Sequence, residues 1–238
     1  MKRTIVIGMM LCGCLTFGCV ASTPGPEAEK DAAFYVKMAQ AYMSEGRFQL
    51  ASVELHKALQ QEPGNASVLS NLGIVHLQFQ EYDHAVKYFQ QAVAADPRLT
   101  EAYLNMGIAQ MNIRQFKEAA ESFRQALADP LYTAPERAYY NLGLALYRLG
   151  SYDASIKAFN DALKRNPKYV LPLYGMALVL NRMDRLSEAA ETLEKALEFD
   201  PNIQGDRERF TDDVRKRLRM ATGDAEQDLQ DLLDILKY

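Results

Sequence analysis

The chain of 238 residues contains no tryptophan, only three histidines and only three cysteines. All three cysteines, Cys12, Cys14 and Cys19, lie within the first twenty residues, so the rest of the chain has neither a disulfide framework nor a thiolate metal site. Basic residues are not in excess either, because 27 lysines and arginines face 31 aspartates and glutamates, which gives a net charge of −4. Loss of a leader that contains Lys2 and Arg3 lowers this charge by two, to −6. The clustered basic face of nucleic-acid-binding proteins is therefore not expected.

The motifs of common enzymes are missing as well. The sequence has no serine–histidine–aspartate arrangement and no glycine-rich phosphate loop. His56, His76 and His84 do not have the spacing of metal ligands on one helical face. We therefore expect a protein that is not an enzyme, with no cofactor, no metal and no small-molecule substrate. Its 48% hydrophobic and 24% charged residues are typical of a folded globular chain.

The N-terminus has the layout of a secretory signal peptide. Lys2 and Arg3 precede a short apolar stretch, and small residues follow before a cysteine. The apolar stretch, residues 5–18, falls short of the roughly 20 residues that a membrane-spanning helix needs. The pattern therefore indicates a leader and not a permanent transmembrane helix.

These residues resemble a bacterial lipoprotein signal, in which a small residue precedes a cysteine that becomes lipid-modified and N-terminal. Cys19 follows Leu-Thr-Phe-Gly and leaves a leader of ordinary length, although Thr16 stands where the family usually has leucine. Cys14 follows Leu-Cys-Gly, a better local match, but leaves a very short leader. The resemblance implies a signal peptide at 1–18, lipidation (palmitate included) at Cys19 with Cys14 as the alternative, and a tether at 19–31. An ordinary cleaved signal with incidental cysteines is the remaining alternative.

Neither candidate cysteine is followed by aspartate, because Val20 follows Cys19 and Leu15 follows Cys14. In the lipoproteins that this leader resembles, an aspartate at that position retains the protein in the inner membrane. The resemblance therefore implies a lipid-anchored protein of the outer membrane that faces the periplasm.

An internal repeat occupies most of the remaining chain. Small and large apolar residues recur together at a step of about 34 residues, and the third step is longer by two. The recurring residues are alanines (Ala58, Ala92, Ala126, Ala162, Ala196), small residues (Ala39, Gly73, Gly107, Gly143, Ala177) and large apolar residues (Leu55, Phe89, Phe123, Phe159, Leu193). Pro63 and Pro97, like Pro167 and Pro201, are one such step apart and end helices, because proline cannot continue a helix.

This register resembles the tetratricopeptide repeat. The resemblance implies an all-α superhelical solenoid of helix-turn-helix repeats, stacked so that neighbours bury a continuous core. The predicted repeats span 32–65, 66–99, 100–133, 136–169 and 170–203, with a two-residue insertion within 131–135. Residues 204–238 read as two capping helices or a degenerate sixth repeat, and the second of them places Leu229, Leu232, Leu233 and Leu236 on one face.

Tetratricopeptide solenoids bind peptides along a concave groove lined mainly by the first helix of each repeat. By resemblance, the second, fifth, ninth and twelfth positions of each unit face this groove, and the last three of these supply the predicted lining. The predicted protein-binding residues are Val36, Gln40, Met43, Ile74, Leu77, Leu104, Ile108, Met111, Tyr140, Leu144, Tyr147, Tyr174 and Leu178. Such an apolar lining departs from repeats that grip a C-terminal carboxylate with Lys and Asn, and it favours an apolar-faced helix or strand of an envelope protein. The alternative is that curvature, or the cap, buries these side chains.

A lipoprotein of this length and repeat number resembles the pilotins of type IV pilus biogenesis. In that family the lipoprotein helps a secretin to reach the outer membrane and to assemble into its multimeric pore. The resemblance implies a secretin segment with an apolar face as the partner. A general periplasmic scaffold for peptidoglycan enzymes is the alternative, and an accessory protein of outer-membrane assembly is a third possibility.

Overall fold

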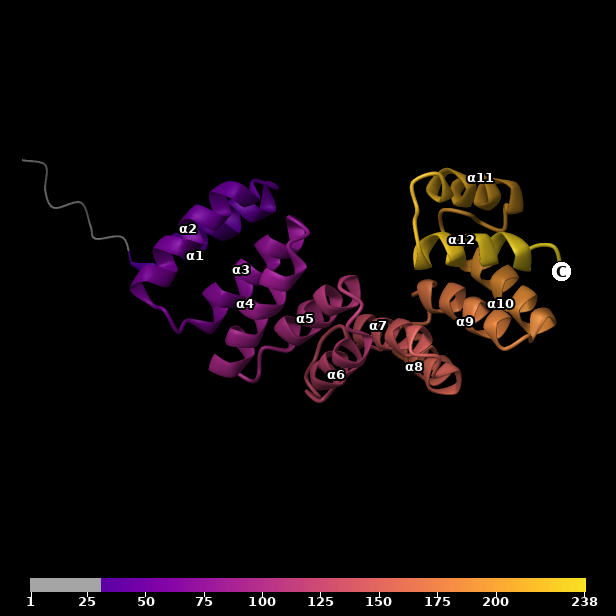
Figure 1. The fold of residues 1–238 in the computed structure, drawn as a ribbon, viewed down its shortest axis with the longest axis horizontal. Coiled ribbons are helices and arrows are strands. Elements are labelled where there is room, and N and C mark those ends of the chain that lie inside the picture. The colour runs from indigo at the N-terminus through magenta and orange to yellow at the C-terminus, as the bar shows by residue number, and fades with distance from the viewer. Residues whose placement is uncertain (1–30) are drawn as a thin grey trace, which may run out of the picture. The chain divides into compact units, whose positions relative to one another are not determined.

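A computed structural model describes residues 31–238, and within them it contains twelve α-helices and no strand, which confirms the predicted all-α fold (Figure 1). The helices of the five repeats are α1 (Ala32–Ser44), α2 (Phe48–Gln61), α3 (Ala66–Gln78), α4 (Tyr82–Ala95), α5 (Thr100–Asn112), α6 (Phe116–Leu127), α7 (Pro135–Arg148), α8 (Tyr152–Arg165), α9 (Leu171–Arg182) and α10 (Leu186–Phe199). Two more follow, α11 (Arg207–Leu218) and α12 (Asp224–Ile235). The predicted leader, the tether before Asp31 and both candidate lipidation sites, Cys19 and Cys14, lie outside the described residues.

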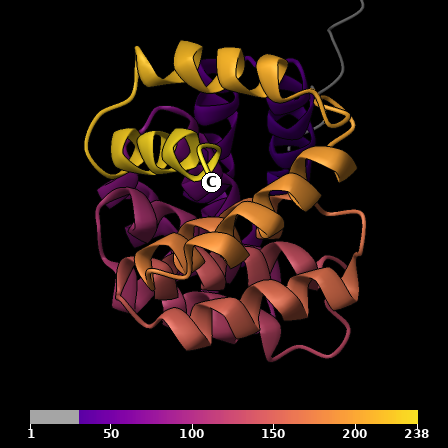
Figure 2. The same ribbon diagram turned by 90° about the vertical axis from the view of Figure 1, so that its right-hand side faces the viewer.

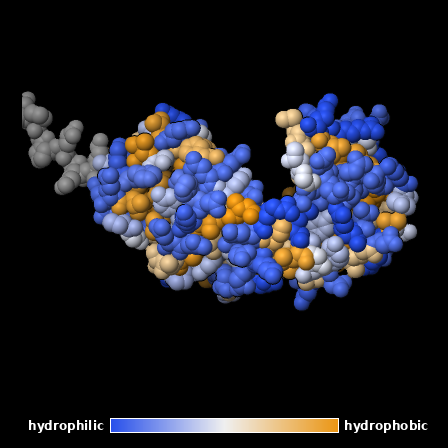
Figure 3. Space-filling model, viewed as in Figure 1, coloured by the Kyte–Doolittle hydropathy of each residue, from blue (hydrophilic) through white to orange (hydrophobic). Residues whose placement is uncertain are grey.

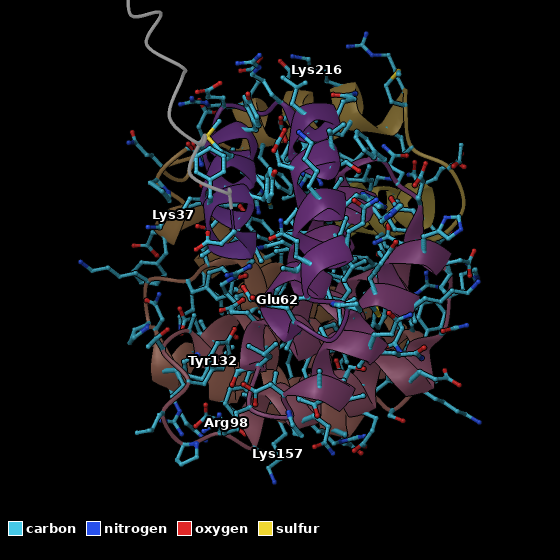
Figure 4. All side chains as sticks on the ribbon, turned by 90° about the vertical axis from the view of Figure 1, so that its left-hand side faces the viewer. Lys37, Glu62, Arg98, Tyr132, Lys157 and Lys216 are labelled. Atoms are coloured by element: carbon cyan, nitrogen blue, oxygen red, sulfur yellow. The ribbon has the colours of Figure 1, made fainter. Side chains whose placement is uncertain are left out.

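Successive helices pack against one another from α1 to α10. Charged side chains lie on the outside of the helices, where the exposed Lys37 of α1, Lys157 of α8 and Lys216 of α11 project away from the backbone (Figure 4). Within residues 31–238, no helix combines the length and the apolar character that are needed to cross a bilayer.

Each repeat is held together by one close contact between a small residue of its first helix and a large residue of its second. A β-carbon added to Gly107 in α5 would lie 2.5 Å from the ring of Phe123 in α6. Gly73 and Gly143 have the same relation to Phe89 and Phe159, at 2.6 and 2.5 Å. The three phenylalanines are fully buried, so a side chain at these glycines has no room.

The terminal repeats use a different pair at the same positions. There the small residue is Ala39 or Ala177, and the large residue 16 positions later is Leu55 or Leu193. Each alanine lies with its leucine in one buried cluster. Glycine is thus paired with phenylalanine and alanine with leucine, which keeps the combined volume at the helix crossing nearly constant.

The turn inside every repeat places one residue in the left-handed region, two positions after the first helix ends. Gly46 and Gly150 take this position in the first and fourth repeats, with φ of 74° and 72°. Gln80, Arg114 and Asp184 take it in the other three, with φ near 60°. A left-handed residue at this position ends the helix and lets the following backbone N–H groups satisfy its last carbonyls.

The two C-terminal helices fold back onto the last repeats. Helix α12 packs against α9, α10 and α11, and Figure 2 shows it (yellow) between α11 and the fifth repeat. Leu229, Leu232 and Ile235 are buried in one cluster with residues of α9 and α10. Leu233 and Leu236 pack against the same cluster at its edge. The predicted apolar face therefore meets the core, and Ile235 belongs to it as well.

Gly107→Ala tests the close contact inside a repeat. The added methyl overpacks the crossing, which typically costs about 1–3 kcal/mol, while alanine regains about 1 kcal/mol of helix propensity. We expect a net loss of up to about 2 kcal/mol in the free energy of unfolding, measured in urea. Combining it with Phe123→Leu recreates the alanine–leucine pair and should recover part of the loss.

Gly64→Ala is the matched control, because Gly64 has no atom within 4 Å of an added β-carbon and no positive φ. It should leave the urea midpoint unchanged. Equal effects of Gly107→Ala and Gly64→Ala would refute the crowding argument.

Candidate protein-binding groove

The first helices of the repeats lie next to one another along one side of the stack. Besides its partner in the same repeat, α5 contacts α3 and α7, and α7 contacts α9. All thirteen predicted groove residues belong to these first helices. In the space-filling view the surface is hollowed between the N-terminal helix pairs and the C-terminal helices, with apolar residues (orange) near the hollow (Figure 3). The structure divides the predicted groove into two halves that differ in what covers them.

The first three repeats provide what we call the open half. Its members are Val36, Gln40, Met43, Ile74, Leu77, Ile108 and Met111. Gln40 is exposed and the six apolar side chains are half-buried, so each leaves part of its surface uncovered. Leu104 differs from them, because it has no exposed surface and fills the core between the third and fourth repeats.

The fourth and fifth repeats provide the covered half. Here Tyr140, Leu144 and Tyr174 are half-buried, while Tyr147 and Leu178 are only 5% and 6% exposed. They share one hydrophobic cluster with α11 and α12. The alternative that the cap buries the predicted groove residues therefore applies to these two repeats.

Three arginines fix α12 over the covered half by ion pairs. An Nη atom of Arg114 lies 2.5 Å from an Asp224 oxygen, and one of Arg182 lies 2.8 Å from an Asp231 oxygen. Between them, the Arg148 guanidinium makes a two-pronged contact with Asp228, with one donor at 2.9 Å and the other still closer. The three aspartates occupy positions i, i+4 and i+7 of α12, which lie on one helical face.

The hydroxyl of Tyr147 joins two of these ion pairs. It donates to Asp228 at 3.0 Å and accepts from Nε of Arg182 at 3.2 Å. Burial is the main cause that raises the pKa of Tyr147 to about 12, so the phenol keeps its proton at neutral pH. Burial also opposes the charge of Arg148, but the hydrogen bond and charge of Asp228 outweigh it and raise the pKa of the guanidinium. Tyr147 and Arg148 therefore keep their protonation states around neutral pH.

A cavity of about 600 Å³ remains between the covered half and the C-terminal helices. Its wall includes Tyr140, Leu144, Leu178, Phe210 and Leu229. Tyr174 also lines it, and its ring stacks on that of Phe210 with centroids 5.7 Å apart. Arginine and aspartate side chains, among them Arg148 and Asp228, also line the cavity.

The sequence matches a model of the tetratricopeptide repeat over residues 36–99, 104–170 and 140–202. The chain belongs to the tetratricopeptide repeat family. Proteins built from this repeat act as scaffolds for protein–protein interaction, and their stacked helices create extended concave binding surfaces.

Two curated relatives match only in part. The chain is 33% identical over 86 residues to TPR repeat-containing protein MJ1428 of Methanocaldococcus jannaschii, and 24% identical over 162 residues to Superkiller protein 3 of Saccharomyces cerevisiae. These matches cover 35% and 66% of this chain, but they span only 14% and 9% of the two relatives.

Solved tetratricopeptide structures match over a larger share. PilW, described as a widely conserved type IV pilus biogenesis factor, superposes with a TM-score of 0.68 at 20% identity, covering 86% of this chain and 90% of PilW. Pseudomonas aeruginosa pilF superposes with a TM-score of 0.64 at 21% identity, covering 85% of this chain and 96% of pilF. MamA of Desulfovibrio magneticus superposes with a TM-score of 0.66 at 25% identity, covering 71% of this chain and 94% of MamA.

The arginines and aspartates that fix α12 in this tetratricopeptide protein were not among the predicted site residues. A signal for them exists, because Arg114, Arg148 and Arg182 recur at an even interval that equals the usual repeat length. The aspartates 224, 228 and 231 share one helical face, which also appears in the sequence. Neither pattern alone identifies the other as its partner.

One group of side chains within residues 31–238 has the composition and proximity of metal ligands. It consists of His76, Glu81 and His84, whose ligand atoms all lie within 4.8 Å of one another. The sequence argument against metal ligation considered the histidines on a single helical face. The structure instead brings His76 and His84 together across the turn between α3 and α4.

Asp228→Ala tests how α12 is held. The change leaves Arg148 and Tyr147, which are mostly buried, without their acceptor. Hydrogen bonds to charged groups contribute about 1.5–3 kcal/mol, so we expect a loss of this size in the free energy of opening α12. Hydrogen exchange of the α12 amides measures it directly.

Asp234→Ala is the control, since Asp234 lies on the same helix but pairs with Lys237 at the surface. Exposed pairs contribute about 0–1 kcal/mol, so the exchange of α12 should change little. If both variants speed exchange equally, the ion pairs with the groove do not anchor the helix.

Proposed function

We propose that this protein is a lipid-anchored, non-enzymatic outer-membrane protein of the pilotin type, which binds a secretin segment in the open half of its groove and assists secretin assembly. The observation that carries the proposal is the open half itself. Its six apolar side chains are half-buried and not fully covered within residues 31–238, and the surface is hollowed between the N-terminal helix pairs and the C-terminal helices (Figure 3). Contiguous apolar surface of this kind marks interaction sites on soluble proteins.

The extent of the structural likeness supports the pilus role. The similarity to the two type IV pilus proteins reaches over more of this chain than the similarity to MamA does. At 20% and 21% identity, this structural similarity is evidence for a shared fold alone. The choice of a secretin as partner therefore rests on the resemblance of the whole chain, lipoprotein leader included, to the pilotins.

The lining of the open half indicates the chemistry of the bound segment. Ile74, Leu77 and Ile108 offer aliphatic surface, and Met43 and Met111 add flexible side chains that adapt to different shapes. Gln40 is the polar member. A segment with an apolar stripe, helical or extended, fits this lining and is itself shielded from water while bound.

Anchoring explains how binding assists assembly. A lipid anchor confines the groove to the membrane in which the pore forms, which raises the effective concentration of the bound segments there. Short flexible linkers give effective concentrations on the order of millimolar. A modest affinity per groove is then sufficient to gather secretin subunits.

Deletion of the gene tests the proposal in the cell. Envelopes are run on a denaturing gel without heating and probed for the secretin. We expect the heat-resistant multimers to disappear while monomers persist. Unchanged multimers would show that the protein is not a pilotin, and affinity capture of peptidoglycan enzymes would then test the scaffold alternative.

A double variant, Ile74→Glu with Ile108→Glu, tests the open half. Two carboxylates placed in the apolar lining must be desolvated when a segment binds, so we expect at least a tenfold loss of secretin multimers in the complemented deletion strain. Val53→Glu is the control, because Val53 is a 50% exposed apolar residue of α2 outside the groove. Circular dichroism verifies that both variants keep their helicity. A folded groove variant that restores multimers fully would place the binding site elsewhere.

A further inference from the structure

Three side chains with metal-binding atoms meet where α3 turns into α4. His76 lies in the last turn of α3, Glu81 immediately precedes α4, and His84 lies in its first turn. Nδ1 of His76 is 2.5 Å from Oε2 of Glu81, and Nδ1 of His84 is 4.0 Å from the same oxygen. One carboxylate oxygen of Glu81 therefore faces the Nδ1 atom of each histidine.

We infer that His76, Glu81 and His84 form a binding site for a divalent transition-metal ion of the zinc type. Two imidazole nitrogens and one carboxylate oxygen are a donor set that zinc accepts, with metal–ligand distances of about 2.0–2.2 Å. In tetrahedral geometry such ligand atoms lie about 3.3 Å from one another. The site therefore needs the 2.5 Å pair to open and the 4.0 Å pair to close, each by less than about 1 Å.

The fixed member of the site is His76. Its side chain is only 18% exposed, and its ring stacks on Tyr88 with centroids 5.0 Å apart and planes 15° apart. The turn beside it is fixed as well, because the Glu81 N–H donates to the His76 carbonyl at 2.9 Å and Gln80 takes the left-handed conformation. A ligand that is held in place before binding loses little entropy when the ion arrives.

The other two members are free to adjust. The side chains of His84 and Glu81 are 62% and 48% exposed, and a rotation of either moves its ligand atom without disturbing the core. Their exposure leaves the fourth coordination position open to water or to a ligand from outside. Three protein ligands with one open position distinguish this site from a closed structural zinc site, which uses four.

Zinc titration of residues 31–238, which form one compact unit, tests the inference by calorimetry. This segment has no cysteine, so any tight binding reports on histidine and carboxylate ligands alone. We expect one ion per chain. Loss of a partner that merely orients a metal ligand typically costs about 10–100-fold in affinity, so His84→Ala, which removes a ligand, should cost at least about tenfold. Cobalt substitution adds an optical signature of low coordination number.

His56→Ala is the matched control, because His56 is an exposed histidine of α2 whose Nδ1 contacts the backbone carbonyl of Ser52. It should bind zinc like the unmodified chain. Binding that is equally strong in His84→Ala, or equally weakened in His56→Ala, would show adventitious binding to surface groups and overturn the inference. Neither result bears on the proposed function, because zinc binding is measured by calorimetry and the groove variants are measured by secretin multimers.

Discussion

The contact between a small residue and a large one in each repeat is the constraint on which the remaining architecture depends. Where Gly107 meets Phe123, the two helices approach so closely that even a methyl group does not fit. This distance sets the tilt of each first helix against its second, and hence the way in which successive first helices line one face. A fourth contact, between Gly175 and Phe159, applies the same restriction across two repeats. The close approach of the paired helices thus determines the floor of the groove, whichever residues line it.

A concave face built in this way carries apolar side chains, and the chain covers only part of them itself. Leu229, Leu232 and Ile235 of α12 fill the space over the fourth and fifth repeats. The ion pairs beside them favour one position and orientation of α12, because partly buried charge pairs are often better at specifying one arrangement than at increasing stability. The first three repeats receive no such cover from residues 31–238, which leaves the open half available to a partner.

The local parts of this picture were predictable from the sequence, and the long-range parts were not. The regular recurrence of small and large residues predicted the fold, because each repeat needs one such contact between its first and its second helix. It did not predict that Leu104 is fully buried, since position within a repeat does not show how far the next repeat covers it. The pairing of Arg148 with Asp228 joins residues 80 positions apart, and no local pattern specifies such a contact. The meeting of His76 and His84 depends on how one turn bends, which a search along a single helical face overlooks.

The charges at the ends of α7 and α9 also fix where α12 lies. Arg148 and Arg182 are the last residues of α7 and α9, and the same position in the first three repeats is held by Ser44, Gln78 and Asn112. If α12 moved along the groove by one or more repeats, its aspartates would lose guanidinium partners and keep a desolvation cost. Its position is therefore specified by the sequence of the repeats, and α12 serves as a fixed cap over the covered half. Ser44, Gln78 and Asn112 carry no charge, and Arg114, two residues beyond α5, is already paired with Asp224. The open half therefore has no guanidinium at these helix ends for a second acidic helix, which fits the proposal that a segment binds there through its apolar face.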